Sequence, residues 1–267
     1  MRILLSRLRT LRRRPATWFT FGILTGLLVL ILVAVVATGE EGGGGGPPGP
    51  DRLILVTFPV AYELILSFVL GLGGLFAVTY GAAVAGSEWS WGTLKVAVAR
   101  GESRSRYMVL TFAAVATFLL VGTLAAFTIG VVVAYLGATV AGVSTDGISD
   151  ADTLRQLPEW FARGWFAMAE QGALGFAVAT LARSQLAGIG IGIALYFGEA
   201  FAGIFLPDIV RYLPFNVANA AVGFGEDGFG AGPDPLPQAS AMLLAGVWLV
   251  GSLLIAAVFT ERADITD

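Results

Sequence analysis

The chain has 267 residues, of which 56% are hydrophobic and 13% are charged, and it contains no His and no Cys. Soluble domains carry about 25% charged residues, so this composition, with a mean hydropathy of +0.80, excludes an ordinary soluble globule. The missing His and Cys exclude thiol nucleophiles, imidazole bases and Cys/His metal centres. The net charge of -3 argues against a nucleic-acid partner, because surfaces that bind phosphate backbones are basic. The sequence therefore predicts an all-α integral membrane protein.

Nucleotide hydrolysis is not expected in this chain. A P-loop requires Gly-Lys-Ser or Gly-Lys-Thr, whereas the single lysine, Lys95, stands in Gly-Thr-Leu-Lys-Val. We therefore expect a subunit with no catalytic residues, no cofactor and no metal site. Any ATP hydrolysis linked to its function would belong to a partner chain.

Residues 1–14 predict an amphipathic helix at the start of the chain. Leu4, Leu8 and Leu11 share one side of such a helix at i, i+4 and i+7, while arginines such as Arg9 and Arg13 lie on the other side. We expect this helix to lie in the headgroup layer of the membrane, with its leucines toward the lipid and its arginines attracted to anionic headgroups.

Long charge-poor runs predict six membrane-spanning helices in one domain that covers residues 1–267. A bilayer-spanning helix requires about 20 apolar residues. The second run is too long for one straight span, and we expect Pro59 and the cluster Gly71, Gly73 and Gly74 to break it. The predicted spans are 17–38, 64–85, 107–136, 164–182, 185–206 and 238–260.

Charge asymmetry predicts the orientation of these spans. Twelve of the 16 Lys and Arg residues fall on one side of the arrangement and four on the other. Because cytoplasmic loops are enriched in Lys and Arg, we expect both termini and the connection 86–106 in the cytoplasm. The long connection 207–237 is then external, and the expected location is the plasma membrane of a prokaryotic cell.

Small residues are frequent in the fourth and fifth predicted spans. Gly172 and Gly175 lie in one of them, and Gly188-x-x-x-Gly192 lies in the next. Glycines at such spacing allow two helix backbones to approach closely, so we expect these spans to pack tightly on their neighbours.

The connection between the second and third spans carries the most distinctive pattern in the chain. Over residues 88–100 it predicts a short amphipathic cytoplasmic helix, with Trp91, Leu94 and Val98 on one apolar ridge and charges beside it. Gly101 is suited to end that helix in a left-handed turn. The ridge predicts docking in the groove of a soluble partner, although a plain interfacial loop with aromatic residues at the membrane surface is the alternative.

This connection resembles a pattern found in permease subunits of ATP-binding-cassette transporters of the type 2 exporter class. The pattern is a Glu, then Gly-Thr-Leu, then a basic-Gly-x-Ser-Arg turn that leads into the next span. The resemblance implies that two permease copies or paralogues pair, and that each docks its intracellular helix on a separate ATPase subunit. The residues that would couple to the ATPase are Glu88, Trp91, Gly92, Thr93, Leu94, Lys95, Arg100 and Arg104.

Three carboxylates fall inside or beside predicted spans, namely Glu63, Glu170 and Glu199. Counting residues along each span places all three in its outer half. Ionisable groups at membrane depth are costly and commonly face a bundle interior or a wet cavity, so these residues are candidates for a translocation path. Local pairing, protonation or a shallower position would make them structural instead.

Two other functions stay open beside an ATP-driven exporter. A stand-alone ion-coupled transporter or channel would use the three carboxylates as coupling sites. A membrane assembly subunit would transport nothing. In each case we expect the lipid bilayer to be a partner and nucleic acid not to be one.

Overall fold

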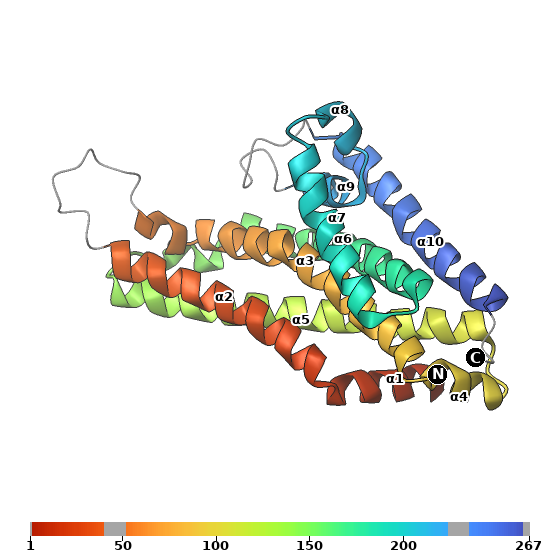
Figure 1. Cartoon of the computed structure of the whole chain (residues 1–267). Helices are drawn as coiled ribbons and strands as arrows, with labels where there is room; N and C mark the ends of the chain where they lie inside the picture. The colour runs from red at the N-terminus through yellow and green to blue at the C-terminus, as the bar shows by residue number, and fades with distance from the viewer. Residues whose placement is uncertain (1, 40–51, 224–234, 264–267) are drawn as a thin grey trace.

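The computed structural model describes residues 2–39, 52–223 and 235–263. Within these ranges every regular element is helical (Figure 1). Five helices are long and apolar enough to cross a membrane, which makes the chain an all-α membrane protein. They are α2 (Pro15–Gly39), α3 (Val60–Ser90), α5 (Arg104–Val140), α7 (Gln185–Ala202) and α10 (Gln238–Arg262).

Helix α6 (Ala151–Ala182) contains the predicted fourth span and is the most polar of the long helices. Asp150 is the N-cap that precedes the helix, and its carboxylate accepts hydrogen bonds from the hydroxyl and the backbone N–H of Thr153. These bonds hold the pKa of Asp150 below its ordinary value. The side chains of Glu170 and Gln171 in the middle of α6 are buried by other helices of the bundle.

Helices α3 and α6 lie against each other along much of their length because glycines remove side chains from their contact. A Cβ at Gly81 would overlap the carbonyl oxygen of Gly172, and one at Gly175 would overlap that of Val78. Contacts run in the same order along both helices, from Gly73 near Met168 toward the α6–α7 turn, so the two helices are parallel. The close approach predicted from Gly172 and Gly175 is confirmed.

The break predicted at Pro59 is confirmed, because the short helix η1 (Arg52–Val56) precedes it and α3 follows it. The break predicted at the glycines is wrong, because α3 continues without interruption from Val60 to Ser90. Pro59 stands immediately before the helix rather than within it. Gly73 and Gly74 face α6, where a Cβ would meet Met168 and Gln171. These glycines therefore serve a helix contact and do not bend the helix.

Helix α7 touches the rest of the chain along a narrow stripe. Its buried residues are Gly188, Gly192 and Glu199, of which Gly188 packs on Ala179 and Gly192 on Val78. Large side chains on its other sides are exposed. The Gly-x-x-x-Gly pattern therefore serves close packing, as expected, and the exposed apolar sides suit a lipid environment.

Short elements complete the connections between the long helices. The 3-10 helix η1 (Arg52–Val56) precedes the start of α3, and η2 (Asp146–Ser149) follows the end of α5. Helix α4 (Thr93–Ala99) connects the end of α3 to the start of α5. The predicted connection 207–237 contains α8 (Pro207–Val210) and α9 (Pro214–Val222), while its residues 224–234 lie outside the described part.

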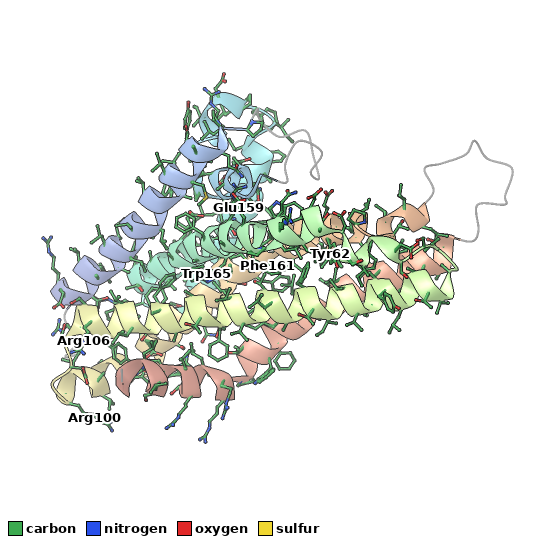
Figure 2. The ribbon with its side chains drawn as sticks, turned by 180° about the vertical axis from the view of Figure 1, so that it is seen from behind. Tyr62, Arg100, Arg106, Glu159, Phe161 and Trp165 are labelled. Atoms are coloured by element: carbon green, nitrogen blue, oxygen red, sulfur yellow. The ribbon has the colours of Figure 1, made fainter. Side chains whose placement is uncertain are left out.

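The bundle is gathered at one end and splayed at the other (Figure 1). Helices α2 and α5 run beside the first half of α3, whereas α7, α9 and α10 diverge from them. Aromatic rings connect α3 and α5 with α6. Phe127 of α5 stacks on Tyr62 of α3 and meets Phe161 of α6 edge-on. Figure 2 labels Tyr62 and Phe161. The start of helix α1 and the end of α10 lie near α4, and this end of the bundle is named the α4 end.

Helix α1 (Arg2–Arg13) crosses this α4 end, and its leucines differ from expectation in what they contact. Leu11 is 1% exposed and belongs to the main core of the protein, against which Leu4 and Leu8 also pack. The amphipathic helix is thus confirmed, but the expectation that its leucines face lipid is wrong, because they pack on the protein core, in which α5 is the main neighbour of α1.

Candidate functional site

The α4 end is built around a sharp turn between α3 and α4. Helix α3 ends at Ser90, and Gly92 then adopts φ +66° before α4 begins at Thr93. That left-handed conformation favours glycine, since any Cβ would be strained there. The expected helix over 88–100 is therefore two pieces, with Glu88 on the last turn of α3 rather than on α4.

Glu88 is fully buried and holds the site together. Its carboxylate accepts hydrogen bonds from Arg7 at 3.0 Å and from Arg14 at 2.9 Å. The hydroxyl of Thr93 donates to it at 2.6 Å, and the hydroxyl of Tyr107 donates as well. One carboxylate thus connects α1, the α1–α2 junction, α4 and the start of α5.

The two arginines of this cluster also contact aromatic rings. The guanidinium of Arg7 lies 4.1 Å from the ring centre of Tyr107, and that of Arg14 lies 5.0 Å from the ring centre of Trp91. Arg14 in addition donates to the Ser87 hydroxyl at 2.6 Å. Cation–π contacts and charge-assisted hydrogen bonds together offset the cost of burying these charges.

Helix α4 has an inner and an outer face. Leu94 and Ala97 are buried in the main core, and Val98 packs against that core. The expectation that Leu94 docks on a partner is therefore wrong, because the chain itself covers it, whereas Val98 is half-buried. The outer face, taken over residues 91–100, carries Val96 and Lys95 on α4 and the flanking residues Trp91 and Arg100. All four are exposed, Trp91 by 63% and Val96 by 50%.

Arg104 belongs to the fold rather than to the outer face. Its guanidinium donates to the backbone carbonyls of Thr260, Glu261 and Ala263 at 3.4, 3.1 and 2.8 Å. In return the Glu261 carboxylate accepts from the backbone N–H of Ser105 at 2.9 Å. Each helix end thereby satisfies the other, so the expectation that Arg104 contacts an ATPase is replaced by a link between α5 and α10.

Arg183 joins the remaining helices at the α4 end, and the sequence analysis did not single it out. It sits at the α6–α7 turn with a left-handed φ of 50°. Its guanidinium lies 5.3 Å from the ring centres of both Trp89 and Phe259. A basic residue in the short turn between two predicted spans was the available signal, but its ring partners are distant in sequence.

The three candidate carboxylates do not form one site. Glu63 lies in the first turn of α3 and is exposed, so it is separate from the other two. Glu170 and Glu199 are both buried, and they lie close enough for their charges to repel. The expectation of a shared polar path is therefore wrong for Glu63 and stays a prediction for the other two.

Glu170 and Glu199 differ in their hydrogen bonding. Within the described ranges, neither oxygen of Glu170 has a hydrogen-bond partner. Glu199 instead accepts from the backbone N–H groups of Phe215 and Asn216 at 3.3 and 2.6 Å, and from the Asn216 side chain at 2.8 Å. It therefore caps the N-terminus of α9, where a negative charge is favourable.

The remaining chemistry of the described residues is limited. No group of three or more Asp, Glu, His or Cys residues in 2–39, 52–223 and 235–263 could hold a metal ion.

A comparison with models of known protein families finds no match, and a comparison with curated proteins finds none either.

Proposed function

We propose that this chain is the transmembrane subunit of an ATP-driven exporter, of the type 2 class of ATP-binding-cassette transporters that the segment 86–106 resembles. It would act as a pair of copies or paralogues with two separate ATPase subunits. The observation that carries the proposal is the attachment of α4 to the buried carboxylate of Glu88 at the end of α3, which also connects α1 and α5.

This attachment is suited to transmit a movement from a partner bound at α4 to the helices of the bundle. Leu94 and Ala97 fix the inner face of α4 to the core, so a load on the outer face reaches α3 and α5 directly. The outer face combines Trp91 and Val96 with Lys95 and Arg100. An apolar centre with flanking cations is suited to a groove with acidic edges on a soluble partner.

The proposal includes α6 as a sixth crossing helix, with both termini in the cytoplasm of a prokaryotic cell. The parallel course of α3 and α6 supports this crossing, because it brings the α6–α7 turn to Trp89 at the α4 end. Basic residues gathered at that end, such as Arg7, Arg14, Arg100 and Arg183, support the orientation.

Cross-linking from the outer face of α4 tests the proposal. The chain contains no cysteine, so a single Val96→Cys can carry a photoactivatable cross-linker in membranes of the native host. Because Val96 lies on the proposed docking face, the expected adduct contains a soluble protein with a Walker A P-loop. Val140→Cys is the matched control, since that residue is 80% exposed at the far end of α5.

Recovery of the P-loop protein from position 96 and not from position 140 would support the coupling role. Equal recovery from both positions, or no P-loop protein from a fully labelled position 96, would contradict it.

An ion-coupled transporter is the second candidate, and Glu170 favours it. A buried carboxyl without a partner within a membrane bundle is suited to take up a proton or a cation. Transport by the purified chain alone in vesicles, driven by a pH gradient and abolished by Glu170→Gln, would favour this candidate over the exporter.

A further inference from the structure

Helix α1 has an outer face that the fold does not use. Its inner face carries Arg7 and Leu11, which the Glu88 cluster and the core engage. On the outer face Arg9, Arg12 and Arg13 are exposed, and none of the ion pairs in the described part of the chain includes them. Three unpaired arginines on one short helix make a surface suited to an anion.

Aromatic residues at the start of α2 indicate the depth of this surface. Trp18 and Phe19 are 65% and 69% exposed, and the Trp18 indole N–H donates to the backbone carbonyl of Arg12 at 2.8 Å. Tryptophan is enriched where the hydrocarbon core meets the headgroups, and each headgroup layer extends about 5–8 Å beyond that core. Arg12 and Arg13 therefore lie at headgroup level.

A shallow hollow on α1 has the chemistry of a phosphate site. It measures about 520 Å³ and is lined by Leu5, Ser6, Arg9, Thr10 and Arg13. Arg9 and Arg13 are one helical turn apart, so both guanidinium groups can reach one bound group. The hydroxyl of Ser6 adds a donor, whereas that of Thr10 already donates to the Ser6 carbonyl.

We propose that the outer face of α1 binds the headgroup phosphate of an anionic phospholipid, with Arg9 and Arg13 as its main donors. A lipid accounts for the apolar neighbours of the site as well as for its charge. Leu5 is 51% exposed, and acyl chains can cover it together with Trp18 and Phe19. A free phosphate ion would satisfy the arginines and leave these side chains uncovered.

Native mass spectrometry of the full-length detergent-solubilised chain tests this site without any ATPase. The parent chain is expected to retain phosphatidylglycerol in preference to phosphatidylcholine. Each arginine near an anionic lipid surface contributes about fivefold in affinity, so Arg9→Gln with Arg13→Gln should weaken phosphatidylglycerol binding about 30-fold. Arg9→Lys with Arg13→Lys keeps both charges and should retain most of the affinity.

The matched control is Arg100→Gln with Arg106→Gln. It removes the same charge from two exposed residues at the α4 end, both of which Figure 2 labels. Its phosphatidylglycerol affinity is expected to stay within about twofold of the parent, since charge at a distance is screened.

Three outcomes would overturn the proposal. One is an unchanged phosphatidylglycerol affinity in the variant that lacks both Arg9 and Arg13. Another is equal affinity of the parent chain for phosphatidylglycerol and phosphatidylcholine, which would leave the outer face of α1 to an acidic protein. The third is displacement of the lipid by millimolar inorganic phosphate, which would identify a site for the free ion.

Discussion

Glu88 and Glu170 are both 0% exposed, yet they have opposite surroundings. Glu88, at the α4 end, accepts hydrogen bonds from four side chains, two of them arginines. Glu170, in the middle of α6, has no hydrogen-bond partner among the described residues. The comparison teaches that burial alone does not assign a role to a carboxylate. A satisfied one holds helices together, whereas an unsatisfied one is available for a ligand or a proton.

The largest effect is expected from Glu88→Gln. The amide keeps the shape of the side chain but leaves Arg7 and Arg14 without their counter-charge. Removing one partner of a buried ion pair costs about 3–5 kcal/mol, and chemical unfolding in detergent should show a loss of this size. Glu63→Gln is the control, because that exposed residue should change stability by less than about 0.5 kcal/mol. Equal stability of the Glu88 and Glu63 variants would contradict the role assigned to the cluster.

An intermediate effect is expected from Glu199→Gln. This change removes the negative charge that caps α9, and charges at a helix N-terminus contribute about 0.3–2 kcal/mol. Hydrogen exchange should become faster at the amides of Phe215 and Asn216, which donate to this carboxylate. Exchange in α10 serves as the internal control. Unchanged exchange at both amides would mean that the carboxylate does not stabilise α9.

The smallest effect on stability is expected from Glu170→Gln. Because the carboxyl makes no hydrogen bond in the described structure, the change breaks none. The free energy of unfolding in detergent should stay within about 0.5 kcal/mol of the parent. A loss as large as that of Glu88→Gln would show that Glu170 has a structural partner, and the contrast between the two glutamates would disappear.

For α1 and α4, the sequence predicted more accurately which side chains are buried than which surface covers them. Leu4, Leu8 and Leu11 form the expected face, but they pack on the protein core rather than on lipid. Leu94 was likewise expected to be covered, although by a partner. Helical periodicity indicates that one face of a helix contacts an apolar neighbour, but it contains no information on the identity of that neighbour.

The partners of Glu88 could not be predicted from local pattern. Arg7 lies 81 residues and Arg14 lies 74 residues before it in the chain. Such pairs depend on how α1 folds back across the end of α3, which no spacing rule specifies. The same holds for the glycines of α3: Gly73 and Gly74 suggested a break, and only the position of α6 shows that they make room for a neighbour.

The uninterrupted course of α3 gives the molecule a mechanical property. The backbone contact at Gly81 lies nine residues from the end of the helix at Ser90 and 21 residues from its start at Val60. At 1.5 Å per residue, the two arms measure about 13 Å and about 32 Å. A rotation of α3 about this contact would move the start of the helix more than twice as far as its end beside α4.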